Sequence, residues 1–157
     1  MTPEDQSKLE KLLFGQRLIA LALVVDGEPV VGLLPYAVAV DRSALYVHAS
    51  RLARHSEGLK AGARWSGAIH EPDSAGTDPL QVPRLILEGS VTPLVEGSPE
   101  LELGARAFLS RFPGAALTLS LPDFTLHRLG LEGGRMILGF GRALNLSASH
   151  FGTSTRG

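Results

Sequence analysis

The feature that most constrains the fold is that apolar residues occur in short runs separated by turn-forming residues. The run Leu18 to Val25 ends at Asp26-Gly27, a pair typical of the tight turn of a β-hairpin. A membrane-spanning helix needs about 20 apolar residues, and this run is much shorter. It therefore predicts a buried strand rather than a membrane span.

The same reading predicts about six to seven antiparallel strands with two to three helices. Expected strands after the first are 30–40, 44–49, 65–70 and 85–95, followed by two or three closing strands among 117–121, 124–131 and 136–140. Helices are expected from Thr2-Pro3 to Gly15, from Ser50 to about Ala61, and from Ser98-Pro99 to before Pro113, because each start carries a capping hydroxyl. Many short strands with few helices predict a mainly β fold with α additions, a β-barrel.

Length and composition predict a single domain over residues 1–146, with 147–157 as a flexible C-terminal tail. The chain has 157 residues, a formal net charge of −1 and no cysteine. The absence of cysteine excludes disulfides, thiolate metal sites and a catalytic thiol. The near-neutral charge predicts no nucleic-acid partner. Glu4 and Asp5 stand where a signal peptide would be basic, so we expect a cytoplasmic protein with no membrane partner.

A local cluster of positive charge lies at the predicted helix start. Arg51, Arg54 and His55 follow Ser50 at spacings that place them on one helix face. Cations at a helix N-terminus are unfavourable, whereas a bound anion there reverses the penalty. Backbone N–H groups, a hydroxyl and two guanidinium groups suit a phosphate. The alternative is that these side chains are simply solvated.

Other polar groups give weaker indications of chemistry. The segment Gly139-Phe140-Gly141-Arg142 lacks the lysine of a phosphate-binding loop. No nucleophile elbow accompanies Ser50, Asp123 and His127. His70 has too few ligating neighbours in the sequence for a metal site. We therefore predict no metal ligand among the residues outside the tail.

Four segments follow one another in an order that is typical of one known family. They are Val31 to Ala37, His48 to Leu59, Asp78 to Gly89, and Leu121 to Phe124 with Gly139 to Arg142, and together they span about residues 18–146. In these segments the chain resembles the pyridoxamine 5′-phosphate oxidase-like FMN-binding split-barrel family, and more closely its haem-utilisation branch. The resemblance implies a split β-barrel of Greek-key-like topology. It also implies a homodimer with FMN at the subunit interface, acting on a small-molecule ligand.

The resemblance also implies which residues bind the cofactor. Arg54 and His55 match the family's two cationic phosphate contacts, and Arg84 matches a polar side chain that reaches the flavin of the partner subunit. The implied cofactor-binding set is Leu34, Pro35, His48, Ala49, Ser50, Arg51, Arg54, His55 and Arg84.

This chain departs from the family's oxidases at two positions. Leu33 and Val38 stand where those enzymes carry an arginine and a lysine. The C-terminal arginine and histidine that bind vitamin B6 have no counterpart, so this is not a true pyridoxamine phosphate oxidase. The favoured function is therefore an FMN-dependent oxidoreductase of unknown substrate.

Two alternatives remain open on the same fold. One is a haem-binding or haem-degrading protein in which His150 ligates iron, with Asp123 as the supporting acid. The other is a non-catalytic barrel module that has lost its cofactor. The missing cations at Leu33 and Val38 favour the second of these.

Overall fold

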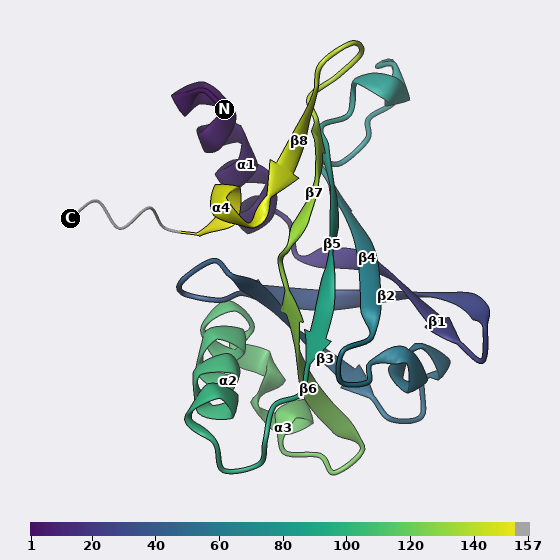
Figure 1. Ribbon diagram of the computed structural model, residues 1–157, viewed down its shortest axis with the longest axis vertical. Helices are drawn as coiled ribbons and strands as arrows, with labels where there is room; N and C mark the ends of the chain where they lie inside the picture. The colour runs from purple at the N-terminus through teal and green to yellow at the C-terminus, as the bar shows by residue number, and fades with distance from the viewer. Residues whose placement is uncertain (153–157) are drawn as a thin grey trace.

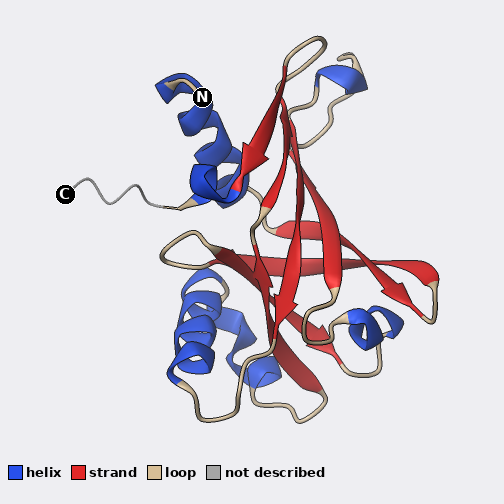
Figure 2. Ribbon diagram, in the orientation of Figure 1, coloured by secondary structure: helices blue, strands red, loops and turns tan. Residues whose placement is uncertain are grey.

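The computed structural model describes residues 1–152 and shows a mainly antiparallel β fold with short helices (Figures 1 and 2). The strands are β1 (Leu18–Val25), β2 (Glu28–Val38), β3 (Ala44–Ser50), β4 (Arg64–His70), β5 (Arg84–Thr92), β6 (Phe124–Gly130), β7 (Gly133–Ile137) and β8 (Ala143–Ser147). The helices are α1 (Pro3–Gly15), α2 (Pro99–Arg111), α3 (Ala116–Leu119) and α4 (Ala148–Phe151), with 3-10 turns η1 (Arg54–Gly58), η2 (Pro79–Gln81) and η3 (Pro113–Ala115).

Six of the strands close into a barrel, and the other two, β7 and β8, extend the sheet from β5. The strand order is β4-β1-β2-β3-β6-β5-β7-β8, and a further pairing of β4 with β5 completes the ring. Strand β5 pairs with β7 over residues 84–88 and with β6 over residues 91–92. The predicted split β-barrel is therefore confirmed, and both β2 and β5 pair with strands of its two sheets.

Gly89 allows this change of partner on β5. A Cβ atom at residue 89 would lie 1.7 Å from the carbonyl oxygen of Gly130 in β6. No real side chain tolerates that distance, so the close approach of β5 and β6 requires glycine there.

The barrel interior holds the main hydrophobic core. Inward-facing side chains alternate with outward-facing ones along each strand, as the two-residue period of a strand requires. The core includes Leu21 of β1, Tyr36 of β2, Val47 of β3, Ile69 of β4 and Leu87 of β5. A second cluster lies outside the barrel, where α2 packs through Phe108 on β2, β3 and β6.

Two helices begin as the sequence predicts. Thr2 and Asp5 form a reciprocal capping box at α1, and Ser98 Oγ accepts a hydrogen bond from the backbone N–H of Leu101 at the start of α2. None of the helices among the described residues is both long and apolar enough to cross a membrane.

Three expectations are wrong at the level of local structure. The helix expected from Ser50 to Ala61 is only the five-residue turn η1, because Ser50 is the last residue of β3. The strand expected at 117–121 is instead the short helix α3. The tail expected from residue 147 continues the fold through α4, where Phe151 is only 1% exposed. The rest of that predicted tail, residues 153–157, lies outside the described residues.

Removing the Phe151 ring tests whether α4 is part of the folded domain. We expect Phe151→Ala to lower the free energy of unfolding by about 3 kcal/mol, because it empties a fully buried aromatic site. Urea unfolding followed by tryptophan fluorescence measures the change. Phe140→Ala is the matched control, because the Phe140 ring is 79% exposed, and it should have little effect. Equal stability of wild type and Phe151→Ala would mean that α4 does not contribute to the core.

Candidate functional site

The cofactor-binding residues predicted from the sequence are divided between the two faces of the barrel wall. Leu34 and Ala49 are buried in the core inside the barrel, so only their backbone atoms could reach an external ligand. Pro35 lies on the outer face, directly opposite Leu18 of β1. Leu33 is also outward and 66% exposed, whereas Val38 packs partly buried against the core.

The end of β3 brings Ser50, Arg51 and Arg54 together, but without the helix that the sequence predicts. Ser50 Oγ accepts a hydrogen bond from the backbone N–H of Leu52, forming a tight turn. The Arg51 side chain donates from Nε to Thr125 Oγ1 at 3.1 Å, and its backbone N–H donates to the carbonyl of Asp123. Arg54 is exposed. The cationic side chains are therefore present, whereas the helix dipole expected to assist them is not.

His48 lies under helix α2 and is only 7% exposed. Its ring packs at 5.6 Å from the Phe108 centroid and 5.0 Å from the Phe124 centroid. Burial lowers the pKa of His48, so the ring is neutral near pH 7. A direct contact with a large external cofactor would require α2 to move.

His55 points into one end of the barrel. A Cβ atom on Gly32 would lie 2.7 Å from the ring of His55, so the imidazole occupies the space that the glycine leaves. Its Nε2 atom is buried without a hydrogen-bond partner among the described residues, and burial lowers its pKa. The role of His55 as the second cationic phosphate contact, which the resemblance implies, stays a prediction.

The outer face of β1, β2, β4 and β5 presents an apolar surface. In register, Leu33 of β2 lies opposite Ala20 of β1, Ala20 opposite Ala68 of β4, and Ala68 opposite Ile86 of β5. Directly opposed residues share a face of the sheet, so these four side chains form one row across the barrel wall. We call this row, with Leu18, the apolar wall.

A hollow of about 410 Å³ lies on the apolar wall. Leu18, Ala20, Leu33 and Ala68 contribute to its lining, and Arg17 and His70 lie at its polar end. This volume falls within the range of small-molecule and cofactor sites, which are mostly apolar with a few polar groups. A smaller hollow of about 220 Å³ shares Ala68 and His70 and adds Arg84.

Sequence reasoning did not find that His70 lines this hollow. His70 is the last residue of β4 and lies directly opposite Arg84 of β5. Its Nδ1 atom lies 2.7 Å from the carbonyl oxygen of Glu71. The signal that could have found it is strand alternation, which places His70 on the same face as Ala68.

His150, the iron ligand of the haem alternative, is held in an ordered turn. The backbone N–H of Ser147 donates to His150 Nδ1 at 2.8 Å, and the His150 carbonyl lies 3.4 Å from the side-chain amide nitrogen of Gln6 in α1. Figure 1 shows α4 beside α1, away from the β1–β2 hairpin. Asp123, the expected supporting acid, lies in the turn before β6, where its carbonyl accepts from Arg51.

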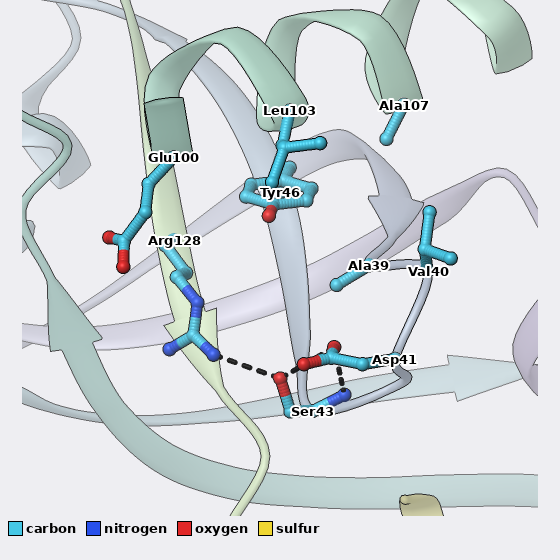
Figure 3. Close-up of a pocket in the computed structure, with 9 residues that line it drawn as sticks. All are labelled: Ala39, Val40, Asp41, Ser43, Tyr46, Glu100, Leu103, Ala107 and Arg128. Atoms are coloured by element: carbon cyan, nitrogen blue, oxygen red, sulfur yellow. Dashed lines mark hydrogen bonds between the residues drawn. The ribbon is translucent and has the colours of Figure 1, made fainter. Parts of the chain in front are cut away.

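A third hollow, of about 620 Å³, lies between α2 and the β2–β3 turn (Figure 3). In its wall, Arg128 Nη2 donates to Ser43 Oγ at 2.9 Å, and Ser43 donates to Asp41 through both its backbone and its hydroxyl. The guanidinium and the Asp41 carboxylate are thus already bridged within the wall. The hollow contains none of the cofactor-binding residues predicted from the sequence.

His127 of β6 makes the stability of the folded protein depend on pH in a way that can be tested. It lies directly opposite Val47, and burial, with smaller contributions from His48, Arg51 and His55, lowers its pKa to about 4. The folded state therefore binds fewer protons than the unfolded chain between pH 6.5 and about 4, so stability falls as pH falls through that range. We expect His127→Gln to reduce the loss of unfolding free energy between pH 7.5 and pH 5 by about 1–2 kcal/mol. Urea unfolding at both pH values measures this, and an unchanged loss would contradict it.

Comparison with known proteins supports the fold. No protein-family model matches the chain, and no curated protein matches it. Among solved structures, a haem-binding protein from Mycobacterium smegmatis superposes with a TM-score of 0.82 at 23% identity, over 96% of this chain and 61% of that one. The haem storage protein HutZ from Vibrio cholerae superposes with a TM-score of 0.69 at 23% identity, over 83% of this chain and 89% of that one.

A third solved structure also has the same fold. A protein of unknown function from Agrobacterium tumefaciens superposes with a TM-score of 0.77 at 26% identity, over 97% of this chain and 61% of that one. This chain thus spans about three fifths of the length of two of these three proteins. Together the matches show that this chain shares the split-barrel fold of these proteins.

Proposed function

We propose that this chain binds haem on the apolar wall of its barrel. The observation that carries the proposal is the hollow of about 410 Å³ lined by Leu18, Ala20, Leu33 and Ala68, with a histidine at its polar end. Haem is a flat, largely apolar ring with two carboxylates at one edge, and it would supply an iron atom that a single protein nitrogen can ligate.

Both the apolar and the charged side chains around the hollow fit such a ligand. The apolar wall offers side chains without polar atoms, so covering it with a porphyrin removes apolar surface from water. Arg84 lies at the same end of the wall as His70, and its guanidinium donates to the carbonyls of Leu80 and Val82. A guanidinium has five N–H donors, so Arg84 keeps capacity for a haem carboxylate. The same ligand is supported by two proteins of similar structure, the haem-binding protein from Mycobacterium smegmatis and the haem storage protein HutZ.

The proposal includes a homodimer with the cofactor between subunits. Val24 of β1 and Val31 of β2 extend the apolar wall beyond the hollow, and both are mostly exposed. A second copy of this chain is the occupant we propose for that surface, because its own wall offers the same complementary apolar row. Haem held against the wall would then be covered from its other side.

FMN is a second candidate, favoured by one observation. Ser50, Arg51 and Arg54 place a hydroxyl and two guanidinium groups at the end of β3, and this combination suits a phosphate. An FMN-dependent oxidoreductase remains the reaction predicted for that case, in which the flavin supplies the redox chemistry.

A carboxylate introduced into the hollow tests the haem proposal. We expect Ala68→Glu to weaken haemin binding at least tenfold, because a charge would have to be desolvated beneath the porphyrin. Absorbance titration of the purified protein with haemin measures the affinity. Ala107→Glu is the matched control, because Ala107 is half-buried in the hollow beside α2. Loss of binding in Ala107→Glu but not in Ala68→Glu would overturn the proposal.

A charge introduced at Val31, outside the hollow, tests the proposed dimer. Light scattering at micromolar concentration should give twice 16.6 kDa for the wild type, and Val31→Glu should shift the mass toward a monomer. Because obligate dimer interfaces are strongly apolar, one buried carboxylate in each subunit is enough to oppose association. A monomeric wild type would contradict the proposal.

The FMN candidate is tested at the end of β3. Arg54→Glu should weaken FMN binding to the apo-protein by about 2 kcal/mol, because it removes a charge-assisted contact and adds repulsion. Fluorescence titration measures the affinity. Lys60→Glu is the control, because it makes the same charge change at an exposed position beyond η1. Equal FMN affinity in wild type and Arg54→Glu would exclude this phosphate site.

A further inference from the structure

We infer that His70 Nε2 is the axial ligand of the haem iron. This inference rests on the proposed haem function and assigns the one protein atom that would bind the metal. The expectation from the sequence is instead that His150 is the iron ligand of the haem alternative.

The tautomer of His70 is the one that ligation by Nε2 needs. A carbonyl oxygen can only accept a hydrogen bond, so the contact of 2.7 Å between Nδ1 and the Glu71 carbonyl requires a proton on Nδ1. The neutral ring then carries its lone pair on Nε2. Histidines that ligate metals commonly donate their other N–H to a backbone carbonyl in this way, which fixes the ring orientation.

His150 has the opposite tautomer. A backbone N–H can only donate, so the 2.8 Å contact from Ser147 requires a lone pair on His150 Nδ1. The neutral ring then carries its proton on Nε2, and ligation through that atom would first have to break the bond from Ser147. The ordered turn that holds His150 in place therefore opposes its use as a ligand.

The remaining histidines are held away from the apolar wall. His48 is buried between Phe108 and Phe124. His55 fills the space over Gly32, and His127 lies opposite the core residue Val47. Of the histidines among residues 1–152, His70 is the one that is both exposed and part of the hollow.

The position of His70 also suits the shape of the ligand. It lies two residues beyond Ala68 on β4, so both side chains project from the same face of the sheet. Arg84 stands directly opposite it on β5. His70 would hold the iron, the apolar wall would contact the apolar ring, and Arg84 would hold a carboxylate.

Two probes separate iron ligation from binding of the ring. Haemin should bind wild type with a sharp, saturable Soret band, and His70→Ala should give a broad band with at least tenfold weaker affinity. Added imidazole should restore the sharp band in His70→Ala. Metal-free protoporphyrin IX should bind both proteins with affinities within about twofold, because it uses the hollow but needs no ligand. His150→Ala is the matched control and should retain the wild-type Soret band.

The outcomes distinguish this inference from the proposed function. If wild type binds neither porphyrin saturably, the haem function fails, and the ligand assignment fails with it. If wild type binds haemin and His70→Ala shows the same band and affinity, the assignment is wrong while the function stands. If His150→Ala loses the sharp band, the ligand is His150. Loss of the band in His70→Ala alone, with rescue by imidazole, supports the assignment.

Discussion

The pairing of β4 with both β1 and β5 is the constraint on which the rest of the molecule depends. It closes the six-stranded ring, and its register decides which side chains of β4 face the core. Trp65 and Ile69 face inward, whereas Ala68 and His70 face outward. A slip of one residue would exchange the two sets, burying His70 and exposing Ile69, so the core and the proposed site are fixed by the same hydrogen bonds.

Close packing across this strand makes such a slip costly. Gly67 faces inward where Ile19 of β1 fills the available space, since a Cβ atom there would lie 2.6 Å from Ile19 Cδ1. Ile19 and Ile69 are both fully buried. The inner face is therefore tightly packed and apolar. The outer face of the same strands is also apolar yet partly exposed, which is the property that a cofactor or a second subunit can use.

Much of the fold could be predicted from the sequence because its signals are local. The Asp26-Gly27 turn fixes the first hairpin, and the capping residues at Thr2 and Ser98 mark the two long helices. Ser50 misled the prediction because a serine before basic residues resembles a helix cap, whereas here it ends a strand and forms a turn with Leu52. Phe151 was missed because one aromatic residue in a polar segment has no periodicity, and its burial depends on long-range packing.

The candidate site could be predicted only in part, because it depends on strand register. The sequence identified Arg84 and Arg54 through resemblance to a family and Arg51 through a local cluster of positive charge, and these roles remain predictions. It could not single out His70 as the ligand proposed here, because the features that distinguish it are its opposition to Arg84 and the hydrogen bond that sets its tautomer. Nor could it show the hydrogen bond from Ser147 that holds His150 in its turn.

The position of the iron in a haem-loaded crystal is the most direct test of where the cofactor binds. Anomalous diffraction at the iron absorption edge locates the metal independently of any variant. We expect one iron per chain at coordination distance from His70 Nε2, with the porphyrin against Ala20, Leu33 and Ala68. Iron bound to His150, or beside Arg51 and Arg54 at the end of β3, would contradict it.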